Sequence, residues 1–92
     1  MTTEEFLATK LGEVDDELRG AILNRGKWSA LCDDRKLLVF LEQRHQSPDF
    51  FGVQGELERI AAGDARIPGI EGPRKKAADF LRNWAGHFQT IE

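Results

Sequence analysis

The most ambiguous stretch of the chain is RKLLVFLEQR, residues 35–44, in which five apolar residues stand between good helix formers. The apolar run Leu37–Leu41 has no clear period, so it fits a buried strand as well as a helix. The charged and amide residues on both sides of this run favour the helix, and no second strand is evident to pair with it. We therefore expect a central helix over about residues 29–46.

The segment before this central helix has the periodicity of an amphipathic helix. Thr2 and Glu5 have the spacing of a capping box, and apolar residues follow at three- and four-residue steps from Leu7 to Ile22. Asn24-Arg25-Gly26 is expected to end this first helix, because asparagine and glycine tolerate the left-handed conformation that often follows helices.

Two more helices are expected after residue 46. Ser47-Pro48-Asp49 predicts the start of a third helix, with the serine as cap and the proline at the first helical position. Gly63 is expected to close that helix, and residues 64–72 form a loop. Pro73 then opens a fourth helix with its own apolar stripe.

These four segments predict an all-α protein, a compact bundle of about four helices joined by short loops. Ninety-two residues make a single domain, residues 1–92. We expect Leu38, Leu41, Phe80 and Trp84 to be deeply buried, and Trp28 with the six phenylalanines to supply much of the core area.

Charge and cysteine content narrow the class of protein. The formal net charge is −3, with 16 acids and 13 Lys or Arg residues spread evenly along the chain. This disfavours a protein whose whole surface binds nucleic acid.

Cys32 is the only cysteine, so no disulfide forms within the chain, and we expect a buried, inert thiol. The N-terminus lacks the features of a secretory signal, and the longest apolar run is too short to span a bilayer. These features predict a cytoplasmic protein with no membrane partner.

The best candidate binding site lies at residues 66–76, where three cations fall on the first turn of the fourth helix. Helix N-termini carry a partial positive charge and usually attract acids. Breaking this local rule is typical of functional sites. The candidate basic patch consists of Arg66, Gly69, Gly72, Arg74, Lys75 and Lys76.

Part of this region resembles a helix-hairpin-helix nucleic-acid-binding motif. Ile67-Pro68-Gly69-Ile70 and Gly72-Pro73-Arg74-Lys75 are similar to its glycine turn and to the helix that follows. Glu71 is an insertion relative to that pattern. The resemblance implies that turn amides and nearby cations hold a phosphate, and hence non-specific nucleic-acid binding through residues 66–76.

A second charged cluster lies in the first helix. Glu13, Asp16 and Glu17 form an acidic patch opposite in sign to the basic one. Two such patches would each steer a partner of the opposite charge. The function favoured by the sequence is a small non-enzymatic regulator, inhibitor or adaptor that binds a protein, a kind of inhibitor that phages and mobile elements often carry. Nucleic-acid binding is the alternative, and the sequence leaves open whether the chain forms a homo-oligomer.

No set of residues in the sequence indicates catalysis or a cofactor. There is no phosphate loop and no nucleophile motif. Glu42 and His45 have the Glu-x-x-His spacing of carboxylate metal sites, but no second such pair exists, so we expect no metal. We therefore expect a protein that is not an enzyme and that holds no cofactor.

Overall fold

The computed structural model describes residues 1–67, 69–70 and 72–91, and these residues contain four α-helices, one short 3₁₀ helix and no strand. The expected all-α fold is therefore confirmed. The run Leu37–Leu41 lies within the second helix. The elements are α1 (Thr3–Gly20), α2 (Arg25–His45), α3 (Gly52–Ala61), α4 (Pro73–Asn83) and η1 (Phe88–Thr90).

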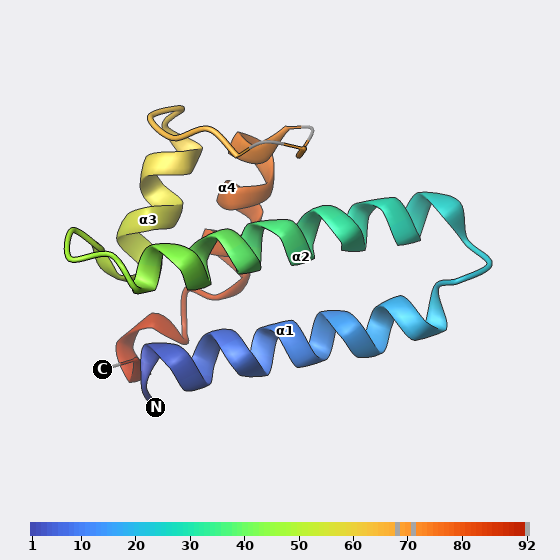
Figure 1. The fold of residues 1–92 in the computed structure, drawn as a ribbon, viewed down its shortest axis with the longest axis horizontal. Helices are drawn as coiled ribbons and strands as arrows, with labels where there is room; N and C mark the ends of the chain where they lie inside the picture. The colour runs from blue at the N-terminus through green and yellow to red at the C-terminus, as the bar shows by residue number, and fades with distance from the viewer. Residues whose placement is uncertain (68, 71, 92) are drawn as a thin grey trace.

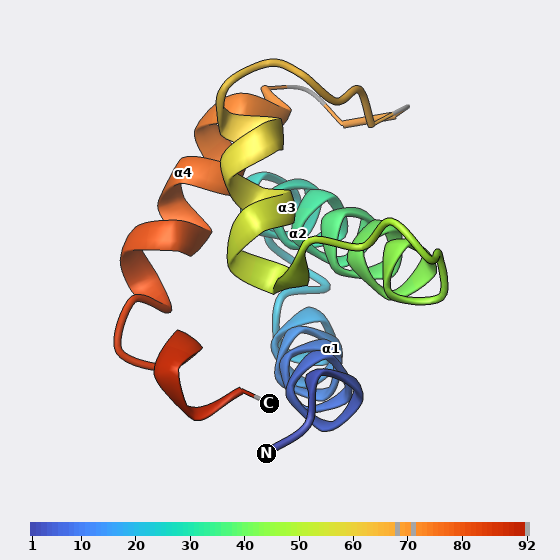
Figure 2. The same ribbon diagram turned by 90° about the vertical axis from the view of Figure 1, so that its left-hand side faces the viewer.

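The helices are arranged as two pairs. The two long helices, α1 and α2, form an antiparallel hairpin, and the two short ones, α3 and α4, pack together over one end of it (Figure 1). The chain then returns through η1 to the start of α1, so both termini lie side by side (Figures 1 and 2). There the amino group of Met1 donates to the carbonyl of Thr90 at 3.2 Å. The opposite end of the hairpin projects beyond α3 and α4.

The first helix begins where the sequence predicts. The Thr2 hydroxyl accepts from the Glu5 amide at 3.1 Å, and the Glu5 carboxylate accepts from the Thr2 amide at 3.2 Å. Both halves of the capping box are present, and two of the orphan amides that any helix start exposes are satisfied. The hydrogen bond from the Thr2 hydroxyl also lowers the pKa of the Glu5 carboxyl.

Three predicted helix boundaries are wrong: the end of the first helix, the start of the second and the start of the third. The second helix begins at Arg25 and not at about residue 29. Asn24-Arg25-Gly26 does not end α1 but starts α2, and the Asn24 side chain accepts from the Lys27 amide at 3.1 Å. Ser47-Pro48-Asp49 does not start α3, because these residues form a turn and the helix begins only at Gly52. Asparagine is favoured both at N-caps and after helix ends, and a proline with an acid suits turns as well as helix starts.

The start of α3 is set instead by a side chain from inside that helix. The carboxylate of Glu56, only 1% exposed, accepts from the Phe51 amide at 3.2 Å. It also takes two hydrogen bonds from the Arg44 guanidinium, at 3.0 and 3.2 Å. This contact raises the pKa of Arg44. The buried carboxylate thus has its partners, as burial of a charge requires.

The main core lies where α3 and α4 cover the hairpin. Trp84 closes it from the C-terminal side, with its ring stacked on Phe80 at 4.3 Å and edge-on to Phe6 at 5.3 Å between centroids. As predicted, Leu38, Leu41, Phe80 and Trp84 are all buried. The residues with no exposed area include Leu7, Leu37, Leu38, Leu41, Leu57, Ile60 and Ala77.

Some of the expected core residues are not in the core. Trp28 is 41% exposed and Phe51 is 62% exposed. Trp28 lies on the first turns of α2, at the projecting end of the hairpin, where neither α3 nor α4 covers it. Cys32 is half-buried rather than fully buried. A separate small cluster of Leu18, Ala21 and Leu31 holds the hairpin together at that end.

Candidate functional site

The predicted basic patch is built on the loop of residues 62–72 and the start of α4. The loop leaves α3 through Gly63, which has φ +85°. There the Gly63 amide donates to Ile60 at 3.0 Å and the Asp64 amide donates to Arg59 at 2.9 Å. These two bonds make a Schellman motif, which satisfies the last carbonyls of the helix. The prediction that Gly63 closes this helix is confirmed.

The middle of the loop is anchored to the core. Ile67 and Ile70 are buried, and Lys36 of α2 donates to the carbonyl of Gly69 at 3.0 Å. Gly69 and Gly72 have φ values of +82° and +66°, a region that favours glycine. The two glycines of the motif-like stretch therefore make backbone turns that other residues would resist. Pro68 and Glu71, also part of that stretch, lie outside the described residues.

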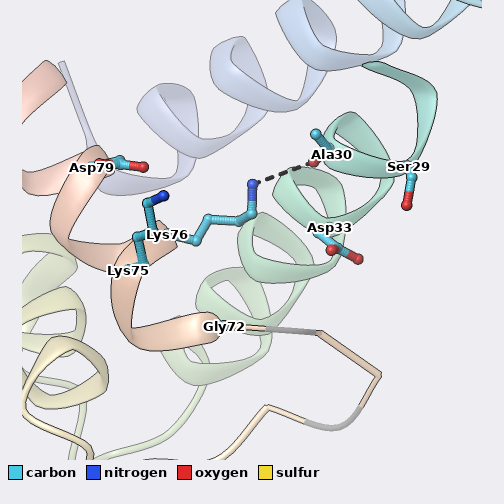
Figure 3. Close-up of a pocket in the computed structure, with 7 residues that line it drawn as sticks. All are labelled: Ser29, Ala30, Asp33, Gly72, Lys75, Lys76 and Asp79. Atoms are coloured by element: carbon cyan, nitrogen blue, oxygen red, sulfur yellow. Dashed lines mark hydrogen bonds between the residues drawn. The ribbon is translucent and has the colours of Figure 1, made fainter. Parts of the chain in front are cut away.

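Within the basic patch, Lys76 is used by the fold. Its ammonium lies 2.5 Å from the Asp34 carboxylate and 3.4 Å from the carbonyl of Ala30, both on α2. Figure 3 shows Lys76 reaching from α4 across to α2, where its ammonium meets the Ala30 carbonyl. Its charge is therefore neutralised inside the molecule. Lys76 is a poor candidate for holding a partner.

A shallow cleft of about 380 Å³ lies between α2 and the start of α4, beside Lys76 (Figure 3). Lys75 lies on its rim and is exposed, but Asp33 and Asp79 also line the cleft. Two lysines, Lys75 and Lys76, and these two acids therefore line the same cleft. An anionic ligand would meet repulsion as well as attraction here, so this cleft is not the strongest part of the patch.

The other side of the α4 start carries a different cleft, of about 440 Å³, which we call the arginine cleft. Arg66 and Arg74 lie at it, and its remaining lining is small or apolar. Both arginines are exposed, and within the described ranges neither side chain has a hydrogen bond or ion pair. The residues that line the arginine cleft are Gly63, Ala65, Arg66, Ile67, Pro73 and Arg74.

The backbone adds to the positive charge at the arginine cleft. The N-cap of α4 is Gly72, which offers no side-chain acceptor, and no carboxylate stands in the first turn of the helix. Within the described residues, no side chain caps the first amides of α4, at the end where the helix dipole is positive. Arg74 and Lys75 belong to the first turn of α4, and Arg66 lines the same cleft as Pro73 and Arg74. The combination is suited to a carboxylate or phosphate oxygen.

The structure therefore divides the predicted basic patch. Arg66 and Arg74 meet at one cleft, Lys75 faces another, and Lys76 is internally paired. The pairing with Asp34 links positions 42 residues apart, so no local signal in the sequence could have revealed it. Ala65 and Ile67, which are not among the residues of the predicted basic patch, give the arginine cleft its apolar lining.

The predicted acidic patch is a solvent-facing stripe on α1. Glu13, Asp16 and Glu17 are all exposed, and their three- and four-residue spacing places them on one face. Glu13 lies 3.4 Å from Lys10, and Asp16 lies 3.1 Å from Arg19. Two of the three acids thus have a cation of their own helix beside them.

The described part of the chain holds neither a metal-ligating cluster nor a helix that could span a membrane. Among residues 1–67, 69–70 and 72–91, no three His, Cys, Asp or Glu side chains are grouped to hold a metal ion. Over the same residues, no helix has both the length and the apolar character needed to cross a bilayer. Comparisons with protein-family models, curated protein sequences and solved structures gave no match.

Proposed function

We propose that this protein is a small non-enzymatic regulator, inhibitor or adaptor that binds an acidic surface of another protein through the arginine cleft. The observation that supports this best is that Arg66 and Arg74 lie at one cleft and that neither guanidinium pairs with any of the described residues. Guanidinium groups bind carboxylates in a two-pronged geometry and are common at protein interfaces. The apolar lining gives room for the carbon atoms of an acidic side chain or its neighbours.

A protein partner suits the cleft better than nucleic acid does. Duplex binding rests on many phosphate contacts, and the exposed cations on the described residues of this loop and helix start are few: Arg66, Arg74 and Lys75. Lys36 of α2 also reaches the loop, but its ammonium is held by the Gly69 carbonyl. Asp64 and Asp79 stand nearby along the chain, and the net charge is −3. An extended phosphate backbone would meet these acids, whereas a single acidic side chain need not.

Nucleic-acid binding through residues 66–76 remains the second candidate. A phosphate-holding turn needs left-handed glycines and free amides at a helix start. Gly69 and Gly72 are left-handed, and no described side chain caps the start of α4. The tagged protein should be used to capture partners from an extract of its native host, with and without nuclease. Partners that survive nuclease support the protein-binding proposal, while loss of all capture on nuclease treatment supports the alternative.

The capture must also depend on the arginine cleft. Arg66→Glu with Arg74→Glu should abolish capture of a specific protein while leaving the melting curve cooperative. Arg82→Glu is the matched control, because Arg82 lies on the same helix, is exposed, and pairs only with Asp79 within the described residues. Equal loss in both variants, or retention in the double variant, would contradict the proposal.

A further inference from the structure

The projecting end of the α1–α2 hairpin carries apolar side chains that the fold does not use. Leu23 is 99% exposed, Ile22 is 66% exposed and Trp28 is 41% exposed. Beneath them, Leu18, Ala21 and Leu31 already form a buried cluster that joins the two helices. We call Ile22, Leu23, Arg25, Lys27 and Trp28 the hairpin tip. Figure 1 shows this end standing clear of α3 and α4.

The charge of this end is the reverse of that of the whole chain. Residues 18–31 contain three bases, Arg19, Arg25 and Lys27, and no acid, although the protein has a net charge of −3. Arg25 and Lys27 are exposed, and among the described residues no side chain pairs with either of them. Arg19 is paired with Asp16.

Helix direction separates the acids of α1 from the hairpin tip. Side chains on a helix lean toward its N-terminus. Because α2 starts at the tip, Arg25, Lys27 and Trp28 lean toward the tip. Because α1 ends there, Asp16 and Glu17 lean back toward the body of the molecule. The outermost surface therefore combines apolar side chains with cations.

We propose that the hairpin tip inserts into the interfacial region of an anionic lipid bilayer. Tryptophan favours the level of the lipid headgroups, the leucine and isoleucine reach the acyl boundary, and Arg25 and Lys27 bind anionic headgroups. The contact is peripheral and involves no spanning helix. It departs from the sequence-based expectation of no membrane partner, which rested on the lack of a secretory signal and of a long apolar run.

Two other occupants suit the tip less well. A second copy of this chain would bring two clusters of like charge together, and like charges repel. A protein groove needs a buried surface of about 800 Å² on each partner, whereas a convex tip of a few side chains offers little area. A bilayer has no such requirement, because it closes around whatever is inserted.

The test uses the full-length protein and two kinds of vesicle. One contains phosphatidylcholine with phosphatidylserine, and the other contains phosphatidylcholine alone. We expect the protein to float with the first kind, with a blue shift in tryptophan emission and weaker binding as salt is raised. Trp28→Phe should remove the shift, because the remaining Trp84 is buried in both states.

Matched variants separate insertion from simple adsorption. Leu23→Ser should weaken vesicle binding about tenfold or more, since it removes a fully exposed apolar side chain from the tip. Phe51→Ser removes an exposed apolar side chain at the start of α3 and should leave binding unchanged. The proposal is overturned if no vesicle binds, if Leu23→Ser binds like the wild type, or if Phe51→Ser loses as much.

Measurements of dimerisation and of partner capture also test the bilayer proposal. Dimerisation that rises with protein concentration and is lost in Leu23→Ser would assign the tip to a second copy and overturn the bilayer proposal. The arginine cleft lies on other elements, so Leu23→Ser should still capture the acidic protein partner. Failure of one proposal is thereby distinguished from failure of the other.

Discussion

Lys76 of α4 lies 2.5 Å from Asp34 of α2, and this ion pair joins two helices that are far apart in sequence. Both side chains are about four-fifths buried, at 19% and 22% exposure. The contact therefore removes one of the three cations at the start of α4 from any role in binding. It assigns that residue to the packing of α4 on the hairpin.

Lys76→Met should thus affect stability and not partner binding. The methionine keeps the apolar stem, but Asp34 loses its cation, and we expect the free energy of unfolding to fall by about 1 kcal/mol. Chemical denaturation monitored by circular dichroism measures this change. Partner capture by the folded variant should equal that of the wild type. If capture fell as far as in the double arginine variant, Lys76 would belong to the binding surface after all.

The two tryptophans should differ sharply in their contribution to stability. Trp84 is 8% exposed and packs on Phe6 and Phe80, so Trp84→Ala leaves a cavity and should cost about 3–5 kcal/mol. Trp28 is 41% exposed at the hairpin tip, and Trp28→Ala should cost about 1 kcal/mol or less. Thermal melts of the two variants make the comparison. Similar losses would mean that the hairpin tip is covered in solution.

Elements governed by local chemistry were the ones that the sequence predicted well. The capping box at Thr2, the left-handed Gly63 and the proline at the start of α4 all act within a few residues. Likewise, the helix formers on both sides of Leu37–Leu41 correctly predicted a helix there rather than a strand. Leucines at helical spacing were correctly placed in the core, because a helix must bury its apolar face.

The predictions that were wrong concern features that depend on contacts between residues distant in the sequence. The start of α3 is fixed by Glu56 with its partner Arg44, not by the Ser47-Pro48-Asp49 signal that precedes it. The exposure of Trp28 follows from α3 and α4 lying over the other end of the hairpin. In the candidate site, the sequence identified the cations. It did not predict that Arg66 and Arg74 lie at one cleft, that Lys75 lies at another and that Lys76 forms an internal ion pair.

Removing the Glu56 carboxylate should loosen the beginning of α3. Glu56→Ala leaves the Phe51 amide without its acceptor and removes two hydrogen bonds from the Arg44 guanidinium, which keeps its contacts with Asp49. We expect a loss of about 2 kcal/mol in unfolding free energy. Amide hydrogen exchange should accelerate at the start of α3 more than in α1. The exposed Glu58 of the same helix gives the control, since Glu58→Ala should change stability little. Equal effects from the two substitutions would show that the Glu56 carboxylate has no specific role at the start of α3.

The capping box of α1 should make stability depend on acid pH. The pKa of Glu5 is lowered in the folded state, chiefly by the Thr2 hydroxyl. The carboxylate therefore stabilises the folded protein above its unfolded pKa, and this contribution is lost as the pH falls below the ordinary glutamate range and through the lowered folded pKa. Glu5→Gln should be less stable at neutral pH and show a flatter fall in acid. Denaturation curves taken from neutral to acid pH test this, and parallel curves for the two proteins would refute it.

A side chain at Gly63 should disturb both the fold and the arginine cleft. The backbone there is left-handed, and the Arg74 side chain lies close to it. With φ at +85°, alanine is strained there, and a Cβ atom would come within 3.3 Å of the Arg74 guanidinium. We expect Gly63→Ala to lower the free energy of unfolding by about 1 kcal/mol, and to weaken partner capture by displacing Arg74. Gly12→Ala is the matched control: Gly12 lies inside α1 with open space around it, so alanine should raise stability by about 0.5–1 kcal/mol and leave capture intact. Denaturation and capture measured on both variants separate the two effects. A Gly63→Ala protein that loses stability but captures its partner fully would show that Arg74 moves aside at no cost to binding.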